Sequence, residues 1–328
     1  ALASKEYAID IGSQIAHGAI RSYVMGDRGS NNEPANATDI AQMKKLVHEA
    51  IDAGALGVST SRVLGHRAMN GEPVPGTFAA EDELYGLGEA LRDAGSGVFE
   101  LAPAGADGQD LGNAPKEMEW MKRLSATIQR PVTFALLQNE TEPSLWKQLL
   151  EESLEATEQG SQCFPQVAGR PFGLLIGLQT HHAFAKRPTF INIAHLPHNE
   201  LVEQLKQSST RTAILNETDT DPDPKVLFDG MSRMIQSMLH RLYPMGEIPD
   251  YEPDPTQSFV SIAETKNTTP EAVLYDYMLE NDGYAMGMMP IFNYVDGNHD
   301  VIREMLLHPQ AVSGLSDGGA HCGMICDA

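Results

Sequence analysis

Cysteine is scarce in this chain, whose 328 residues include only Cys163, Cys322 and Cys326. A sparse, odd-numbered set in a chain of this length excludes a disulfide framework and favours a reducing compartment. His321, Cys322 and Cys326 are close in sequence, but a fourth ligand at zinc-site spacing is missing, which disfavours a structural metal there. We therefore expect a cytoplasmic protein without structural disulfides.

Basic residues are also few, with 23 Lys and Arg against 45 Asp and Glu and a formal net charge of -22. A surface of this sign repels phosphate groups, which argues against nucleic acids and anionic membranes as partners. No apolar run approaches the roughly 20 residues that span a bilayer. Nucleic acids and membranes are therefore not expected as partners, and self-association into a homo-oligomer stays an open alternative.

Two other enzyme classes are not supported by the motifs in this chain. The string Gly314-Leu315-Ser316-Asp317-Gly318 has the Gly-x-Ser-x-Gly pattern, but Ser316 beside Asp317 does not make a catalytic triad. The sequence has no glycine-rich loop of the kind that binds phosphate. Serine hydrolases of the elbow type and phosphate-loop enzymes are therefore set aside.

The sequence does contain a repeating pattern of strand, loop and helix, which is typical of parallel βα units. Helices are predicted at 38–54, 80–95, 116–129 and 143–160, and β-strands at 55–59, 97–101 and 131–137. The segment 15–26 is predicted to be a strand leading into a loop, and Thr38 is the predicted N-cap of the next helix.

The pattern is weaker beyond Gly169. A strand is expected at 172–178, whereas 179–200 shows no clear element and carries His181, His182, His195 and His198. Thr269 and Pro270 are the N-cap and first residue expected for a helix through Leu279. The last predicted elements are a helix at 301–307 and a strand at 311–316.

Polar residues follow several of these predicted strands. The carboxyl ends of parallel strands form one edge of a sheet, where α/β enzymes place ligand-binding residues. The candidates are Ser59, Thr60, Ser61, Arg62, Gln138, Asp317 and His321. Turn chemistry and strand-end hydrogen bonding are the plainer alternatives for them. His17 and Arg21 are expected to fix a strand end rather than contact a substrate, because a buried histidine needs a partner.

Three groups of residues occur in a particular order: His17-Gly18 with Arg21 and Val24-Met25-Gly26, then Gly54 to Ser61, then Ser316-Asp317-Gly318. In this order and separation they resemble the D-aminoacylase branch of the amidohydrolase superfamily, the N-acyl-D-amino-acid deacylases. The resemblance extends over about 15–91 and 309–321.

This resemblance implies an α/β fold built as a distorted (β/α)8, TIM-like barrel with one or two zinc ions, beside a small β-sandwich. We expect residues 1–328 to form one such barrel domain, incomplete at both ends, with an insertion around 179–260 and the sandwich outside the given residues. The implied reaction is hydrolysis of a carbon–nitrogen amide bond by a metal-bound hydroxide, and the implied partner is a small-molecule amide substrate. Asp317 would be metal ligand and general base, and the other candidates would bind the substrate.

The sequence departs from the family pattern at several places. It contains no His-x-His, so the first-strand ligands are expected before Ala1, and Ala102 and Gln138 stand where ligand histidines are expected. Gly319-Ala320-His321 replaces a His-Pro-Arg segment that holds the substrate carboxylate, which disfavours an acyl-D-amino acid. Two alternatives stay open: a non-catalytic or metal-free barrel that acts as a binding or structural subunit, and a binuclear enzyme with His181 or His182 as replacement ligands.

Overall fold

The computed structural model describes residues 4–106, 108–223, 226, 228–314 and 325–327. The chain divides into two compact units: unit 1 is Ala1–Val167 with Glu304–Gly314, and unit 2 is Ala168–Arg303 with Leu315–Ala328. In the part of the chain that is described, no helix is long and apolar enough to cross a membrane.

Unit 1 is built on a six-stranded sheet with the order β1-β2-β3-β4-β5-β9. Strands β1 to β5 are parallel neighbours in chain order, so their carboxyl ends lie along one edge. This confirms the predicted mixed α/β fold with a parallel sheet. Among the described residues the sheet is open, with β1 and β9 at its edges. The strands are β1 (Ile15–Ala16), β2 (Gly57–Ser61), β3 (Val98–Ala102), β4 (Val132–Ala135), β5 (Cys163–Ala168) and β9 (Val312–Gly314).

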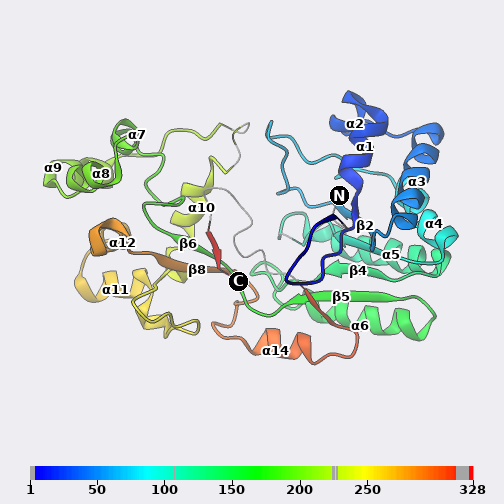
Figure 1. Cartoon of the computed structure of the whole chain (residues 1–328). Helices are drawn as coiled ribbons and strands as arrows, with labels where there is room; N and C mark the ends of the chain where they lie inside the picture. Colours follow the sequence, from blue (N-terminus) through cyan, green and yellow to red (C-terminus); the bar gives the residue numbers. More distant parts are fainter. Residues whose placement is uncertain (1–3, 107, 224–225, 227, 315–324, 328) are drawn as a thin grey trace. The chain divides into compact units, whose positions relative to one another are not determined.

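Four long helices alternate with these strands and pack against one another in chain order (Figure 1). They are α3 (Ala37–Asp52), α4 (Glu81–Ala94), α5 (Ala114–Ile128) and α6 (Leu145–Glu158). Their existence and approximate limits confirm the predictions; α4, for example, ends at a left-handed Gly95. Gly57, the first residue of β2, allows β2 to lie close to β3, because a β-carbon at Gly57 would lie 2.0 Å from the Val98 carbonyl oxygen.

The core of unit 1 lies between the sheet and these helices. Phe99 of β3 packs edge to face on Trp120 of α5, with ring centroids 6.4 Å apart. Val58, Val132 and Cys163 lie in the same row of paired residues and are fully buried with Phe99. This row therefore identifies the helix-facing side of the sheet.

Unit 2 contains a four-stranded antiparallel sheet with the order β10-β6-β8-β7. Its core joins the sheet to the surrounding helices through residues such as Ile235, Leu242, Phe259 and Met289. Helix α12 starts at Pro270 with Thr269 as N-cap, as predicted. The strands are β6 (Phe172–Ile176), β7 (Tyr243–Pro244), β8 (Gly287–Phe292) and β10 (Ile325–Asp327). The helices are α7 (Pro188–Ile193), α8 (His198–Leu205), α9 (Ser208–Asn216), α10 (Met231–Ser237), α11 (Phe259–Lys266), α12 (Pro270–Met278) and α13 (Glu280–Gly283), and α14 (Asp300–Leu306) follows them.

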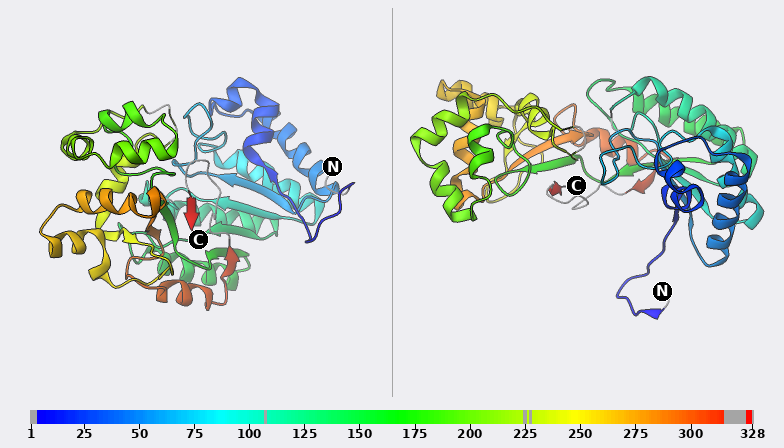
Figure 2. Two further views of the ribbon diagram at one scale, coloured as in Figure 1. Left: turned by 60° about the vertical axis from the view of Figure 1, so that its left-hand side comes forward. Right: turned by 90° about the horizontal axis from the view of Figure 1, so that it is seen from above.

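The predicted strand and loop at 15–26 is wrong beyond its first two residues. Strand β1 is short, and α1 (His17–Met25) and α2 (Asp27–Ser30) follow it. The buried residues His17, Ile20 and Arg21 have the i, i+3, i+4 spacing of one helix face, which the two polar residues obscured. Figure 2 shows residues 4–12 running away from the body of unit 1 as an exposed segment.

Three further predictions need correction. The N-cap of α3 is Asn36 rather than Thr38, because Asn36 accepts from the Thr38 and Asp39 amides and Asp39 completes a capping box. The segment 179–200 contains α7 and the start of α8. The sequence pattern did not predict strand β5, because it contains Pro165 and proline is rare inside a central strand.

Candidate functional site

The register of the sheet divides the candidate residues at its carboxyl edge between two faces. Ser59 pairs with Glu100, and Thr60 pairs with Leu101, which shares a face with the helix-facing Phe99. Thr60 therefore lies on the helix side, whereas Ser59 and Ser61 lie together on the opposite side. The sequence motif alone did not distinguish these two directions.

On the helix side, Thr60 belongs to a buried polar network. Its Oγ1 lies 2.8 Å from His17 Nδ1, and His17 Nε2 lies 2.8 Å from Glu83 Oε1. Arg21 Nε donates to the same oxygen of Glu83 at 2.7 Å. All three of His17, Arg21 and Glu83 are at most 2% exposed. These contacts match the expectation that His17 and Arg21 fix a strand end.

Glu83 supplies the negative charge of this network. Burial by itself would raise the pKa of Glu83, but hydrogen bonds from His17 and Arg21 hold that pKa below its ordinary value. The loop between β2 and α4 closes over the imidazole at Gly76, which has a φ of +100°. A β-carbon at Gly76 would lie 2.8 Å from His17 Nδ1, so a side chain there would disturb the network.

Arg62, predicted to bind substrate, is held by contacts within unit 1. Its Nε donates to Glu117 at 2.8 Å, and its Nη1 donates to the Ala79 carbonyl at 2.8 Å. The guanidinium also lies over the Trp120 ring, 5.8 Å from its centroid. With 17% of its side chain exposed, Arg62 joins the end of β2 to α5 and to the loop before α4.

On the opposite side, Ser61 forms a hydrogen bond that the sequence pattern did not predict. Its Oγ lies 2.6 Å from Nδ1 of His66, an exposed residue in the loop after β2. The backbone of His66 is fixed, since its carbonyl accepts from the Val74 amide at 3.1 Å. The signal in the sequence was a histidine five residues after Ser61 at a polar strand end. In a long loop, this spacing alone does not show that the two side chains are in contact.

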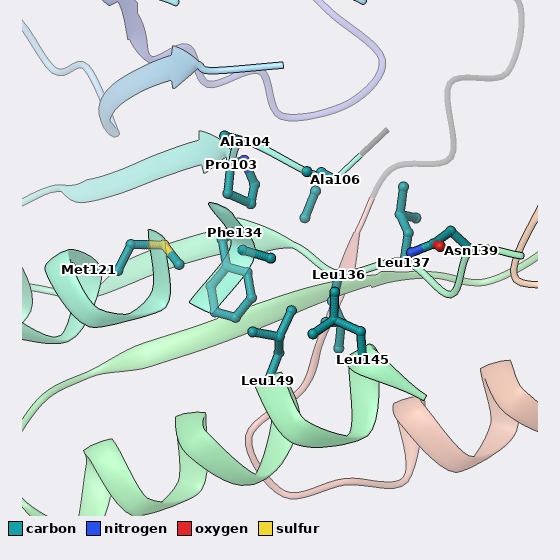
Figure 3. Close-up of a pocket in the computed structure, with 13 residues that line it drawn as sticks. Pro103, Ala104, Ala106, Met121, Phe134, Leu136, Leu137, Asn139, Leu145 and Leu149 are labelled. Atoms are coloured by element: carbon teal, nitrogen blue, oxygen red, sulfur yellow. The ribbon is translucent and has the colours of Figure 1, made fainter. Parts of the chain in front are cut away.

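A mainly apolar pocket opens at the carboxyl ends of β3 and β4. Figure 3 shows Leu145 and Leu149 of α6 facing Phe134 and Leu136, with the small residues of the loop after β3 on the other side. Asn139 lines this pocket, and the neighbouring Gln138 is 3% exposed. The side chain of Asn139 accepts the Glu142 amide at 2.8 Å, which fixes the turn that follows.

Asp317 and His321, the other candidate site residues, lie outside the described residues, and so does Cys322. Within the described ranges, no group of three or more His, Cys, Asp or Glu side chains is placed to hold a metal ion. His182 is buried, accepts the Phe184 amide at 3.2 Å and packs against Phe190. These contacts explain His182 without a metal.

Comparison with solved structures gives several distant likenesses. A D-aminoacylase studied for its binuclear metal centre has 15% identity and a TM-score of 0.49, over 95% of this chain and 48% of that one. The N-acyl-D-glutamate deacylase from Bordetella bronchiseptica, complexed with zinc and a phosphonate inhibitor, has 14% identity and a TM-score of 0.48, over 96% and 50%. The chain thus spans about half the length of these proteins.

A search of curated proteins gave no match. The family comparison is different, because the model described as "Amidohydrolase family" matches residues 1–328, the whole of the given sequence. It agrees with the motif resemblance around His17, Gly54 to Ser61 and Asp317. This chain therefore belongs to the amidohydrolase family.

Proposed function

We propose that this chain is part of a hydrolase that cleaves a carbon–nitrogen amide bond in a small molecule. The observation that carries the proposal is the family match over residues 1–328. The strand arrangement of unit 1 is compatible with it, since parallel strands in sequential order are how a (β/α)8 barrel begins. Closure of these strands into a full barrel is part of the proposal.

In this proposal the reaction takes place at the carboxyl edge of the unit 1 sheet. Ser59 and Ser61 share a face there, and His66 extends the polar group by its contact with Ser61. We assign substrate binding to Ser59, Ser61, Gln138 and His321. Thr60 and Arg62 have contacts with His17 and Glu117 that suit a positioning role.

Asp317 is the proposed general base. A carboxylate beside the scissile bond would take a proton from the attacking water and deliver it to the leaving amine, so that the amine departs neutral. This assignment comes from the Ser316-Asp317-Gly318 motif.

Zinc, as one or two ions with Asp317 among the ligands, remains the proposed cofactor on the basis of family membership. The residues that the structure describes do not supply a complete ligand set. No step is therefore assigned to a metal ion.

A second candidate function is a non-catalytic barrel that binds a ligand or serves as a structural subunit. Ala102 at the end of β3 and the buried Gln138, three residues after β4, favour it, because the resemblance leads us to expect ligand histidines at these two positions. The test is amine release from a panel of N-acyl amino acids and linear and cyclic amides by the full natural polypeptide that carries this chain. Hydrolysis of any member supports the enzyme, and binding without hydrolysis supports the second candidate.

A further inference from the structure

A row of polar side chains crosses three neighbouring strands of unit 1 on the face turned away from α5. Ser59 of β2 pairs with Glu100 of β3, and Glu100 pairs with Thr133 of β4. Neighbouring strands lie about 4.8 Å apart, so the three side chains emerge next to one another. We call Ser59, Glu100 and Thr133 the acidic row.

Two oxygen atoms at the acidic row are buried without a hydrogen-bond partner among the described residues. Thr133 is only 7% exposed, and its Oγ1 has no such partner. Gln14 donates its Nε2 to Glu100 Oε2, which leaves its own Oε1 buried and similarly unpaired. Buried polar atoms without a partner indicate that a group outside the described residues, such as a bound molecule, supplies the missing hydrogen bond.

The layer between the acidic row and the carboxyl edge has little side-chain bulk. It consists of Ser61, Ala102 and Ala135, which follow Ser59, Glu100 and Thr133 by two residues on the same face. All three are partly exposed. No bulky side chain of this layer therefore lies between Glu100, which is itself partly exposed, and the edge where the reaction is proposed.

The charge of this face decides what kind of group fits. Among the residues paired in these two layers on β1 to β5, Glu100 is the one charged side chain, and His66 joins the outer layer from the following loop through Ser61. The available atoms are a carboxylate, an amide oxygen and two hydroxyls, which together favour a hydrogen-bond donor with positive charge. A carboxylate or phosphate would be repelled by Glu100.

We propose that the acidic row binds a protonated primary amine of the substrate, so that the favoured substrates are amides that carry a free alkylammonium group. Glu100 neutralises the ammonium, while Thr133 Oγ1 and Gln14 Oε1 accept its remaining hydrogen bonds. The assignment of a substrate class rests on the proposed function, but binding of the amine can be measured without turnover.

The binding test uses n-pentylamine, which is protonated at pH 7.5, and the neutral 1-pentanol as probes for calorimetric titration. The wild-type protein is expected to bind pentylammonium and to ignore pentanol. Glu100→Gln should weaken amine binding at least about tenfold, because a charged hydrogen bond is lost. The matched control is Glu81→Gln, at an exposed carboxylate of the same unit, which should bind the amine like the wild type.

Thr133→Val separates a binding role from a structural one. Because Thr133 Oγ1 has no described partner, the valine variant should unfold at the same or a higher temperature than the wild type, yet bind pentylammonium more weakly. Ala102→Leu should block access and weaken binding while Glu100 is kept. Equal binding of pentanol, undiminished amine binding by Glu100→Gln, or binding of Mg²⁺ or Ca²⁺ in place of the amine would overturn the inference.

The substrate test compares kcat/KM for Nα-acetyl-lysine and Nα-acetyl-norleucine, which differ in the terminal ammonium group. We expect the wild type to prefer the lysine derivative about tenfold or more and Glu100→Gln to lose the preference. Hydrolysis of both at equal rates contradicts the inference but leaves the proposed function intact. Amine binding without hydrolysis of any amide would support amine binding at the acidic row and contradict the proposed function.

Discussion

His17 Nε2 and Glu83 Oε1 lie 2.8 Å apart in a part of unit 1 from which water is excluded, and Arg21 bonds the same carboxylate oxygen. The contact joins the start of α1 to the start of α4. Through His17 it also reaches Thr60 at the end of β2. One buried carboxylate thus connects three elements at the edge that carries the candidate site.

Glu83→Gln is expected to destabilise unit 1 by about 3–5 kcal/mol, because it leaves the Arg21 guanidinium buried without its counter-charge. The measurement is chemical denaturation followed by a probe in unit 1, such as Trp120 fluorescence. Glu81→Gln, in the same helix but in an exposed pair with Arg123, should cost less than about 1 kcal/mol. Equal effects of the two variants would show that the buried network contributes little.

His182 predicts a pH dependence for unit 2. Burial, with a smaller contribution from the neighbouring His181, lowers the pKa of His182 from 6.5 to about 3. Between these two pKa values the unfolded chain binds a proton at His182 and the folded chain does not. The contribution of His182 to the free energy of unfolding is therefore complete above pH 6.5 and falls by about 1.4 kcal/mol per pH unit as the pH decreases toward 3. His182→Asn should flatten this slope between pH 6 and 4, whereas His48→Asn, on the exposed surface of α3, should keep it. An unchanged slope in His182→Asn would contradict the assignment.

Ser61 and His66 are expected to act as a pair in substrate binding. Each alanine variant should lower kcat/KM about tenfold, and the double variant should lose little more than the worse single variant, because both remove the same contact. His48→Ala is the control for loss of an exposed histidine. Additive losses would mean that the two side chains act independently.

Cys163 should be unreactive in the folded protein. It is fully buried, and burial raises the pKa of its thiol to about 12, so the thiolate that attacks alkylating reagents is almost absent at pH 8. Peptide mapping after iodoacetamide treatment should find Cys163 unmodified in buffer and modified in denaturant. Rapid modification in buffer would show that β5 opens readily.

Sequence patterns predicted the elements of unit 1 better than the directions of its side chains. The regular helices from α3 to α6 have strong apolar periodicity and clear ends, so they could be found without the structure. The motif around Ser59 to Ser61 identified a strand end but not which side chains share a face, since that depends on pairing with β3. The contacts of Arg62 with Glu117 and of His17 with Glu83 join residues 55 and 66 positions apart, a distance over which local patterns carry no information.

We propose that this member of the amidohydrolase family hydrolyses carbon–nitrogen amide bonds and that Asp317 is essential for the reaction. The most direct measurement is amine release from N-acyl amino acids by the full natural polypeptide, supplied with Zn²⁺, as wild type, Asp317→Asn and the exposed-site control Asp300→Asn. We expect turnover by the wild type and the control and at least about a hundredfold lower turnover by Asp317→Asn. Equal turnover by Asp317→Asn, or no turnover by the wild type on any amide, would contradict the proposal.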